Sequence, residues 1–254
     1  MTGNGPAAPL LPAGGDPAGP VAVLLPGTAS SGAFVAATFG PALSAAGYAL
    51  VTGDPPRGPG LLPAWYGLLD DAVRRYRPRL VGGVSLGAHL AARWLTEYAG
   101  DEAGAGIRGL VVALPGWLGR PGADTPAALA SRAGALAVRR DGLAATLART
   151  RAETPGWLGD ELVAAWSRYR PDELVDTLLA AAAAPAPDAV ELAALGTPAG
   201  VVGFADDPVH PTAVARDWAR LLPRSGYREL PMAALGADPG RLGREALAAL
   251  AAAG

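Results

Sequence analysis

Cysteine and lysine are both absent from the sequence, and only two of its 254 residues are histidine. Without cysteine the chain has no disulfide bonds, no thiolate metal sites and no cysteine nucleophile. Two histidines without cysteine disfavour a conventional transition-metal site, and the missing lysine excludes a Walker-type phosphate loop. No glycine-rich dinucleotide fingerprint precedes a helix in the right context, so we predict neither a metal nor a cofactor.

The sequence also lacks an excess of positive charge and any long apolar run. All 21 basic residues are arginine, scattered singly or in pairs, and the formal net charge is −2. Such a chain offers no general field for phosphates, so nucleic acid is not an expected partner. No apolar run reaches the ~18 residues of a membrane span, and residues 1–20 lack the basic and apolar regions of a secretory signal. We therefore expect a cytoplasmic protein without a membrane partner, whose oligomeric state the sequence leaves open.

What the sequence does contain is a repeated alternation of short apolar runs with longer amphipathic segments, from Val21 onward. The apolar runs are mostly continuous and β-rich, as in strands that are covered on both faces. The alternation predicts an α/β fold with a mostly parallel, doubly wound sheet of about six strands, which binds ligands at the carboxyl ends of its strands. The expected strands are Val21–Leu25, Tyr48–Thr52, Leu80–Val84, Leu110–Leu114, Gly200–Phe204 and Tyr227–Leu230.

One interval interrupts this alternation and defines the expected domain organisation. Roughly eighty residues between the fourth and fifth runs show helical patterns without a convincing strand, and they hold three of the six tryptophans. We interpret residues 117–196 as a helical cap over a core made of residues 21–116 and 197–254. A purely structural helical insertion is the alternative. Residues 1–20, rich in glycine, proline and alanine, are expected to form a flexible N-terminal tail.

The sharpest local motif is Gly83-Val84-Ser85-Leu86-Gly87, a G-x-S-x-G between an expected strand and an expected helix. A serine in a tight strand-to-helix turn needs small residues two positions before and after it, because the backbone there approaches itself closely. Such a turn projects the hydroxyl above the sheet edge and directs the next N–H groups, beginning with Leu86, toward a bound anion. The motif makes Ser85 the candidate nucleophile.

With this motif in this setting, the chain resembles the α/β-hydrolase family over about 150 residues, 21–115 and 198–254. The residues Leu25-Pro26-Gly27-Thr28 resemble the oxyanion loop of that family, which implies that the Thr28 N–H is the second oxyanion donor. The leading antiparallel strands of larger members are expected to be absent here. The resemblance implies a serine hydrolase, and its catalytic acid and base are sought in the loops after the last two strands.

The acid candidates stand directly after the fifth expected strand. The family commonly carries its catalytic acid there in an Asp-x-x-x-Pro arrangement, and Asp207 with Pro211 has that spacing. The resemblance therefore implies Asp207 as the acid, with the neighbouring Asp206 left open. The alternative is that these residues form only the acidic turn before a helix, with Pro211 at its first position.

The base is where the sequence departs from the family pattern, because residues 230–239, the loop after the last strand, contain no histidine. His89 follows Ser85 by one helical turn, and we expect it to be a buried, hydrogen-bonded residue of the helix–sheet packing. His210 lies beside the acid candidates at an expected helix N-terminus, which disfavours the imidazolium form. His210 is therefore either the general base or part of the pocket wall.

A further hypothesis exchanges the positions of acid and base. His210, from the earlier loop, would be the base, and Asp238, from the later loop, would orient it, with Asp207 as the other candidate for that role. The alternative role of Asp238 is to cap the last helix, with Pro239 at the first helical position.

Two functions from different classes fit these residues. The first is a serine hydrolase that cleaves an ester, thioester or lactone of a fairly apolar small molecule through an acyl-enzyme on Ser85. The second is a non-hydrolytic α/β-hydrolase-fold protein with an incomplete triad, either an isomerase or cyclase or a small-molecule binder. Labelling of Ser85 by a fluorophosphonate distinguishes the two.

Overall fold

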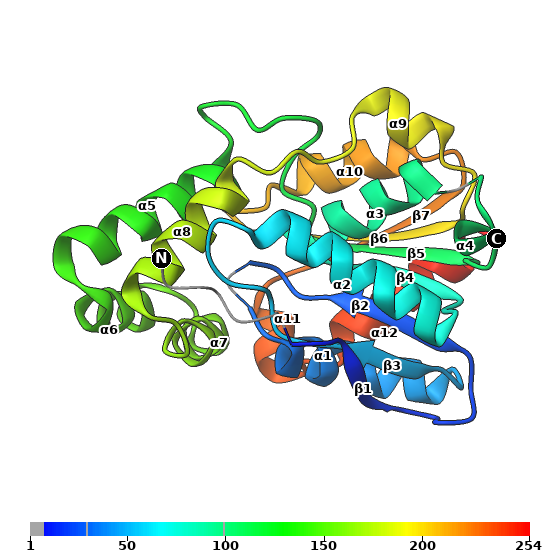
Figure 1. The fold of residues 1–254 in the computed structure, drawn as a ribbon, viewed down its shortest axis with the longest axis horizontal. Coiled ribbons are helices and arrows are strands. Elements are labelled where there is room, and N and C mark those ends of the chain that lie inside the picture. Colours follow the sequence, from blue (N-terminus) through cyan, green and yellow to red (C-terminus); the bar gives the residue numbers. More distant parts are fainter. Residues whose placement is uncertain (1–7, 29, 99) are drawn as a thin grey trace.

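The computed structural model describes residues 8–28, 30–98 and 100–254, and the strands in this part of the chain form one seven-stranded sheet (Figure 1). The strand order is β1-β3-β2-β4-β5-β6-β7, with β1 antiparallel to β3 and every other neighbouring pair parallel. The mostly parallel sheet predicted from the alternation is thus confirmed. The strands are β1 (Leu11–Gly15), β2 (Val21–Leu25), β3 (Ala49–Thr52), β4 (Leu80–Val84), β5 (Gly109–Ala113), β6 (Ala199–Phe204) and β7 (Ser225–Leu230).

Strand β1 lies within the segment that was expected to be a flexible tail without an antiparallel strand. It pairs with β3 at the edge of the sheet, with Leu11 opposite Thr52 and Gly15 opposite Ala49. The tail prediction is therefore wrong for these residues, and the sheet has one strand more than the six expected. Proline and glycine concealed β1, but an edge strand tolerates them because only one of its sides is paired. Residues 1–7 of the expected tail lie outside the described residues.

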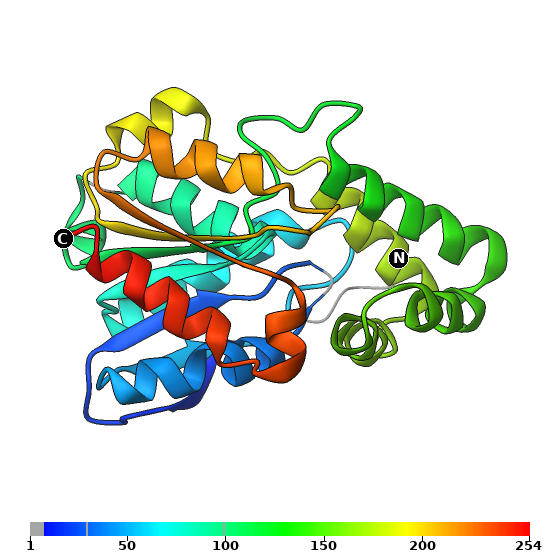
Figure 2. The ribbon, with the colours of Figure 1, turned by 180° about the vertical axis from the view of Figure 1, so that it is seen from behind.

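Helices cover both faces of the sheet, as Figures 1 and 2 show. Alternate residues of the central strands point to opposite faces, so that Val23 and Val112 pack toward α2 and α3, whereas Leu24 and Val111 pack toward α1 and α12. Helix α10 completes the first layer against β6 and β7. The helices of these layers and their connections are α1 (Gly32–Ala45), α2 (Leu61–Tyr76), α3 (Leu86–Tyr98), α4 (Glu102–Ala105), α10 (Thr212–Leu221), α11 (Ala233–Ala237) and α12 (Arg241–Ala251).

The chain between β5 and β6, all of it described, forms helices and no strand. Helix α5 packs on α8, and α6 packs on α7, around a small apolar core of their own that includes Trp166 and Leu178. Figure 1 shows these four helices gathered at one end of the sheet. In the described part of the chain, every helix is too short or too polar to cross a membrane. The helices are α5 (Pro126–Asp141), α6 (Leu143–Glu153), α7 (Gly156–Trp166), α8 (Pro171–Ala182) and α9 (Ala189–Ala194).

The turn from β4 to α3 depends on two glycines that let β2 come close. Gly83 lies opposite Leu25 in the parallel pairing of β2 and β4. A Cβ atom on Gly83 or on Gly87 would lie less than 3.0 Å from the carbonyl oxygen of Leu25, a distance that real Cβ atoms do not adopt. Because that oxygen belongs to the backbone at the end of a buried strand, it cannot move aside without distorting the sheet.

We therefore expect Gly83→Ala and Gly87→Ala each to lower the free energy of unfolding by about 2 kcal/mol or more, as overpacking a rigid core does. Urea unfolding at neutral pH measures the change. The matched control is Gly67→Ala, on an exposed face of α2, where a Cβ meets nothing within 4 Å. That variant should be stabilised by roughly 0.5–1 kcal/mol, because alanine is the better helix former. Equal behaviour of the three variants would contradict the close-approach explanation.

Candidate active site

Ser85 stands alone between the last residue of β4 and the first residue of α3, with a backbone φ of +52°. This left-handed conformation is strained for a residue with a side chain, and it persists only where the surroundings hold it. Here the Ser85 N–H donates to the carbonyl of Ala113, at the end of β5, with an N···O distance of 2.8 Å. The sheet therefore holds the serine in the sharp turn that the G-x-S-x-G motif predicts.

His210 contacts the hydroxyl of Ser85 from the loop after β6. Its Nε2 lies 2.9 Å from Ser85 Oγ, and its Nδ1 lies 3.0 Å from Asp207 Oδ2. With a proton on Nδ1 donated to the carboxylate, the ring presents Nε2 as an acceptor for the serine hydroxyl. Ser85, His210 and Asp207 thus form one continuous hydrogen-bonded chain.

The carboxylate of Asp207 is held by its own loop. Its Oδ1 accepts the N–H of Val209 at 2.7 Å and the N–H of His210 at 3.1 Å, while its side chain is only 6% exposed. Burial raises the pKa of this carboxyl, but the hydrogen bond and charge of His210 and the two backbone N–H groups outweigh burial, so the pKa lies below its usual value. A charged carboxylate at this position favours the His210 tautomer that carries its proton on Nδ1.

The other two acid candidates lie elsewhere. Asp206 accepts the N–H of Met232 at 2.7 Å and so joins the loop after β6 to the loop after β7. Asp238 pairs with Arg244, and its side chain is about half exposed. The hypothesis that Asp238 orients His210 is therefore wrong, because the Nδ1 of that ring is already bonded to Asp207.

The ends of two helices also differ from what was expected. Helix α12 begins at Arg241, with Gly240 at the N-cap position, so neither Asp238 nor Pro239 has the predicted position. Helix α10 begins at Thr212, with Pro211 as its N-cap residue and not at the first helical position. His210 therefore stands just before the helix, in the turn closed by Asp207.

Both expected oxyanion donors lie beside Ser85. Leu86 is the first residue of α3, so its N–H lies among those that have no carbonyl partner within the helix. The loop after β2 packs against the serine so closely that a Cβ on Gly27 would lie 3.3 Å from Ser85 Cβ, and Thr28 follows directly. Both Thr28 and Leu86 line the cavity into which the serine projects.

His89 lies behind this group and is fully buried, which confirms the expected structural role. Its Nε2 accepts the N–H of Gly116 at 2.9 Å, and its ring stacks on Trp218 with 5.5 Å between ring centroids. Burial, with a smaller contribution from repulsion by His210, lowers the pKa of His89 to about 3. His89 is consequently neutral over the whole range in which most enzymes work.

A cavity of about 770 Å³ opens above Ser85, between the carboxyl ends of the strands and helices α5–α8. Its wall is mainly apolar, and it includes the three tryptophans of the 117–196 segment as well as Phe34 and Phe204. Among the described residues no three His, Asp or Glu side chains are grouped so that they could hold a metal ion. The cavity has the size and the apolar character of a small-molecule site.

Three residues of the site were not anticipated from the sequence. Glu161, on α7, lines the cavity and bonds to Ser30 and Ser31, in the loop after β2. A serine before an amphipathic segment is a helix-capping signal, and it could have identified Ser31 as a cap. Glu161 carries no such local signal, because only the packing of α7 brings it to the loop.

Comparisons with known proteins agree with this architecture. No family model matches the chain, and no curated protein matches it significantly in sequence. Among solved structures, it is similar to a bromoperoxidase from Bacillus anthracis, with a TM-score of 0.70, 19% identity and 92% of each chain covered. It is also similar to a thermophilic esterase from Thermogutta terrifontis, with a TM-score of 0.64, 19% identity and coverage of 92% of this chain and 86% of the esterase. An enol-lactonase from Burkholderia xenovorans LB400 has a TM-score of 0.63 and 17% identity, with 86% of this chain and 85% of the lactonase covered. The chain has the α/β-hydrolase fold.

The buried, neutral His89 predicts how stability depends on pH. An unfolded histidine binds a proton as the pH falls below about 6.5, whereas His89 in the folded protein binds one only near pH 3. Because the unfolded state binds more protons in this interval, stability falls as the pH decreases from about 6.5 toward 3. Between pH 7 and pH 5 this one residue should cost about 2 kcal/mol of unfolding free energy.

The test compares urea unfolding of the native chain and of His89→Gln at pH 7 and pH 5. Glutamine can still accept the Gly116 N–H but does not titrate, and His210 is present in both proteins. The loss between pH 7 and pH 5 should be smaller in the variant by that amount. The same loss in both proteins would show that His89 is not the group responsible.

Proposed function

We propose that this chain, which has the α/β-hydrolase fold, is a serine hydrolase that cleaves an ester, thioester or lactone of a fairly apolar small molecule. The observation that carries the proposal is the continuous contact from Ser85 Oγ through His210 to Asp207, at the wall of an apolar cavity. A hydroxyl, a ring nitrogen that accepts its proton and a carboxylate that fixes the ring are the three parts that acyl transfer to serine requires.

The proposed reaction has two steps. His210 Nε2 takes the proton of Ser85 Oγ as the oxygen attacks the substrate carbonyl carbon, and Asp207 stabilises the imidazolium that forms. The N–H groups of Thr28 and Leu86 donate hydrogen bonds to the carbonyl oxygen as negative charge develops on it. His210 then returns the proton to the leaving alcohol, thiol or ring oxygen, which leaves an acyl group on Ser85. Water, deprotonated by His210, attacks this acyl group, and Ser85 recovers its proton as the acid departs.

The cavity wall supports an apolar substrate. Phe34, Trp157 and Phe204 lie together, with ring centroids of Phe34 and Trp157 6.2 Å apart and those of Trp157 and Phe204 6.3 Å apart. Each of the three rings lines the same cavity as Ser85. An aromatic wall of this kind favours an uncharged acyl or alcohol group over a charged one.

The alternative was a non-hydrolytic protein of the same fold, an isomerase, cyclase or binder. Its main support was the absence of a histidine from residues 230–239, the loop after the last strand. His210 lies within hydrogen-bonding distance of Ser85 Oγ, so this reason no longer applies. A fluorophosphonate probe separates the two functions, since it reacts with an activated serine and not with an ordinary hydroxyl. We expect one label per chain on Ser85.

Removing the serine or its base should abolish turnover. We expect Ser85→Ala and His210→Ala each to lower kcat by about 10³-fold or more with a chromogenic short-chain ester, because the groups of such a triad act as a unit. Intact-mass spectrometry after fluorophosphonate treatment should show no label on either variant. Thermal unfolding checks that both variants fold. A folded Ser85→Ala protein with native turnover would refute the proposed function.

The orienting acid is tested by a matched pair of substitutions. Asp207→Asn removes the charge beside His210 Nδ1 and allows the amide to stabilise the wrong tautomer, so kcat should fall by about 10²-fold or more. Asp238→Asn changes a half-exposed carboxylate that pairs with Arg244, and kcat should stay within about twofold of the native value. A large loss of kcat in Asp238→Asn and a small one in Asp207→Asn would instead support Asp238 as the acid that orients His210.

A further inference from the structure

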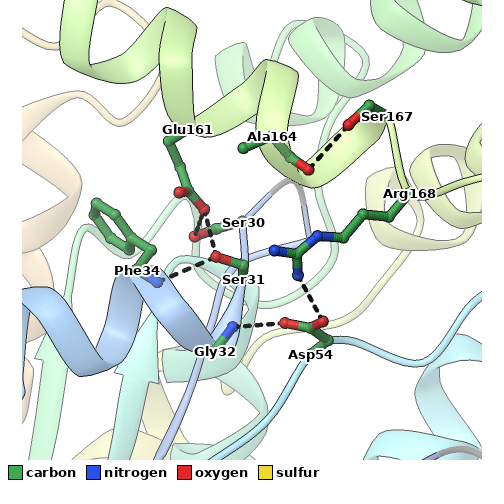
Figure 3. Close-up of polar contacts among 9 residues, drawn as sticks. All are labelled: Ser30, Ser31, Gly32, Phe34, Asp54, Glu161, Ala164, Ser167 and Arg168. Atoms are coloured by element: carbon green, nitrogen blue, oxygen red, sulfur yellow. Dashed lines mark hydrogen bonds and ion pairs between the residues drawn. The ribbon is translucent and has the colours of Figure 1, made fainter.

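Glu161 reaches from α7 to the loop that follows β2, as Figure 3 shows. A single carboxylate oxygen, Oε1, accepts the hydroxyl of Ser30 at 2.9 Å and the hydroxyl of Ser31 at 3.0 Å. These serines follow Thr28 in the chain by two and three residues. The carboxylate therefore joins the helix over the cavity to the loop that carries the proposed oxyanion donor.

The two serines are themselves parts of the backbone structure of this loop. The N–H of Ser30 donates to the carbonyl of Gly27 at 3.2 Å and so ties Ser30 to the residue before Thr28. Ser31 is the N-cap of α1, and its Oγ accepts the N–H of Phe34 at 3.1 Å. Since that oxygen accepts from the backbone, its own proton is free to be donated to Glu161. The carboxylate thus holds the two residues, Ser30 and Ser31, that stand directly before α1.

A second link joins the same two parts of the molecule. Arg168, just after α7, pairs with Asp54 at 2.8 Å, and the other oxygen of Asp54 accepts the N–H of Gly32 at 2.9 Å (Figure 3). Both charged side chains of this pair are almost half exposed, so the pair contributes little to stability. Glu161 is less exposed to solvent than Asp54 or Arg168, and it contacts two hydroxyls of the loop.

The partial burial of Glu161 opposes its charged form. Burial raises the pKa of Glu161, and the hydroxyls of Ser30 and Ser31 and the charge of Arg168 offset only part of that effect. An apolar side chain of similar volume avoids the desolvation cost that a partly buried charge carries. The contacts of Glu161 therefore point to a role beyond stability, because they are made with the loop beside Ser85.

We propose that Glu161 is a positioning residue that, through Ser30 and Ser31, holds the loop after β2 so that the Thr28 N–H points at the carbonyl oxygen of a substrate on Ser85. This inference rests on the proposed hydrolase function. An oxyanion donor acts only when it lies about 2.7–3.1 Å from the oxygen as charge develops there, and a displacement of about 1 Å removes much of its effect. Through Glu161, the position of α7 over the cavity and the position of the donor become linked.

The first experiment separates positioning from substrate binding. We expect Glu161→Ala to lower kcat for a small neutral p-nitrophenyl ester by about tenfold, less than the ~10²-fold or more lost when an oxyanion donor is removed, with KM within about twofold of the native value. Glu161→Gln retains an oxygen that can accept both serine hydroxyls, and its kcat should stay within about threefold of native. Titration with a fluorophosphonate to its end point counts the active molecules, so partial misfolding is not read as a loss of kcat.

The matched control is Asp160→Ala, at the preceding position of α7. Asp160 is exposed and pairs with Arg151 of α6, away from the loop. Its removal should leave both kcat and KM unchanged. A loss in this variant equal to that in Glu161→Ala would show a general effect of disturbing α7 and would overturn the proposal.

A double-mutant cycle tests the route through the serine. Ser30→Ala removes one of the two donors to Glu161, and it should lower kcat in the native background but have little further effect in Glu161→Ala. Independent, additive effects of the two substitutions would overturn the proposal, as would a native kcat in Glu161→Ala or a change confined to KM. Any of these outcomes would leave the proposed function standing, because that function is tested separately by fluorophosphonate labelling of Ser85 and by the turnover of a folded Ser85→Ala protein.

Discussion

The close approach of the backbone after β2 to the turn at Ser85 is the constraint on which the whole site depends. Glycine at positions 83 and 87 leaves room for the carbonyl of Leu25, and the sharp turn that results holds Ser85 at a φ of +52°. The strain of this conformation is borne by the buried strands on either side, since the Ser85 N–H is bonded to β5. The same approach places the backbone of Gly27 and Thr28 against the serine. One steric condition therefore fixes both the hydroxyl and the segment of its proposed oxyanion donor.

The proposed base and acid are fixed in a different way, within one short loop. The carboxylate of Asp207 accepts two backbone N–H groups of its own turn and bonds to the ring of His210, three residues later. Their relative position depends on local backbone geometry and not on the docking of two separate loops. The loop after β7, in which the family resemblance implied the base, instead supports this turn through the bond from the Met232 N–H to Asp206. A histidine in the earlier loop thus reaches the serine, and the later loop supplies neither the proposed base nor the proposed acid.

The features that sequence reasoning found are those that depend on local patterns or on sheet topology. The Gly83–Gly87 motif after an apolar run predicted the turn, and the adjacency of strand ends brought His210 into consideration. The choice of Asp207 over Asp206 and Asp238 rested on the family's Asp-x-x-x-Pro spacing, because the three carboxylates differ otherwise only in how the backbone turns and in which N–H groups or arginine they meet. Strand β1 escaped detection because an edge strand with proline and glycine has no apolar alternation. The segment from 117 to 196 was expected to be helical, but nothing in its pattern marked the residue that contacts the loop.

Two titratable side chains outside the proposed triad, the buried His89 and the partly buried Glu161, show what kind of group the fold accepts near Ser85. His89 is neutral, accepts one backbone N–H and packs on tryptophan rings, so its burial is compatible with a purely structural role. Glu161 is a carboxylate whose burial is opposed by desolvation, and its contacts are two hydroxyls of the loop that carries Thr28. An apolar residue would close the cavity wall at lower cost. The placement of an acid at this point of α7 therefore supports the proposal that the helices over the sheet contribute to the geometry of the proposed reaction as well as to the shape of the cavity.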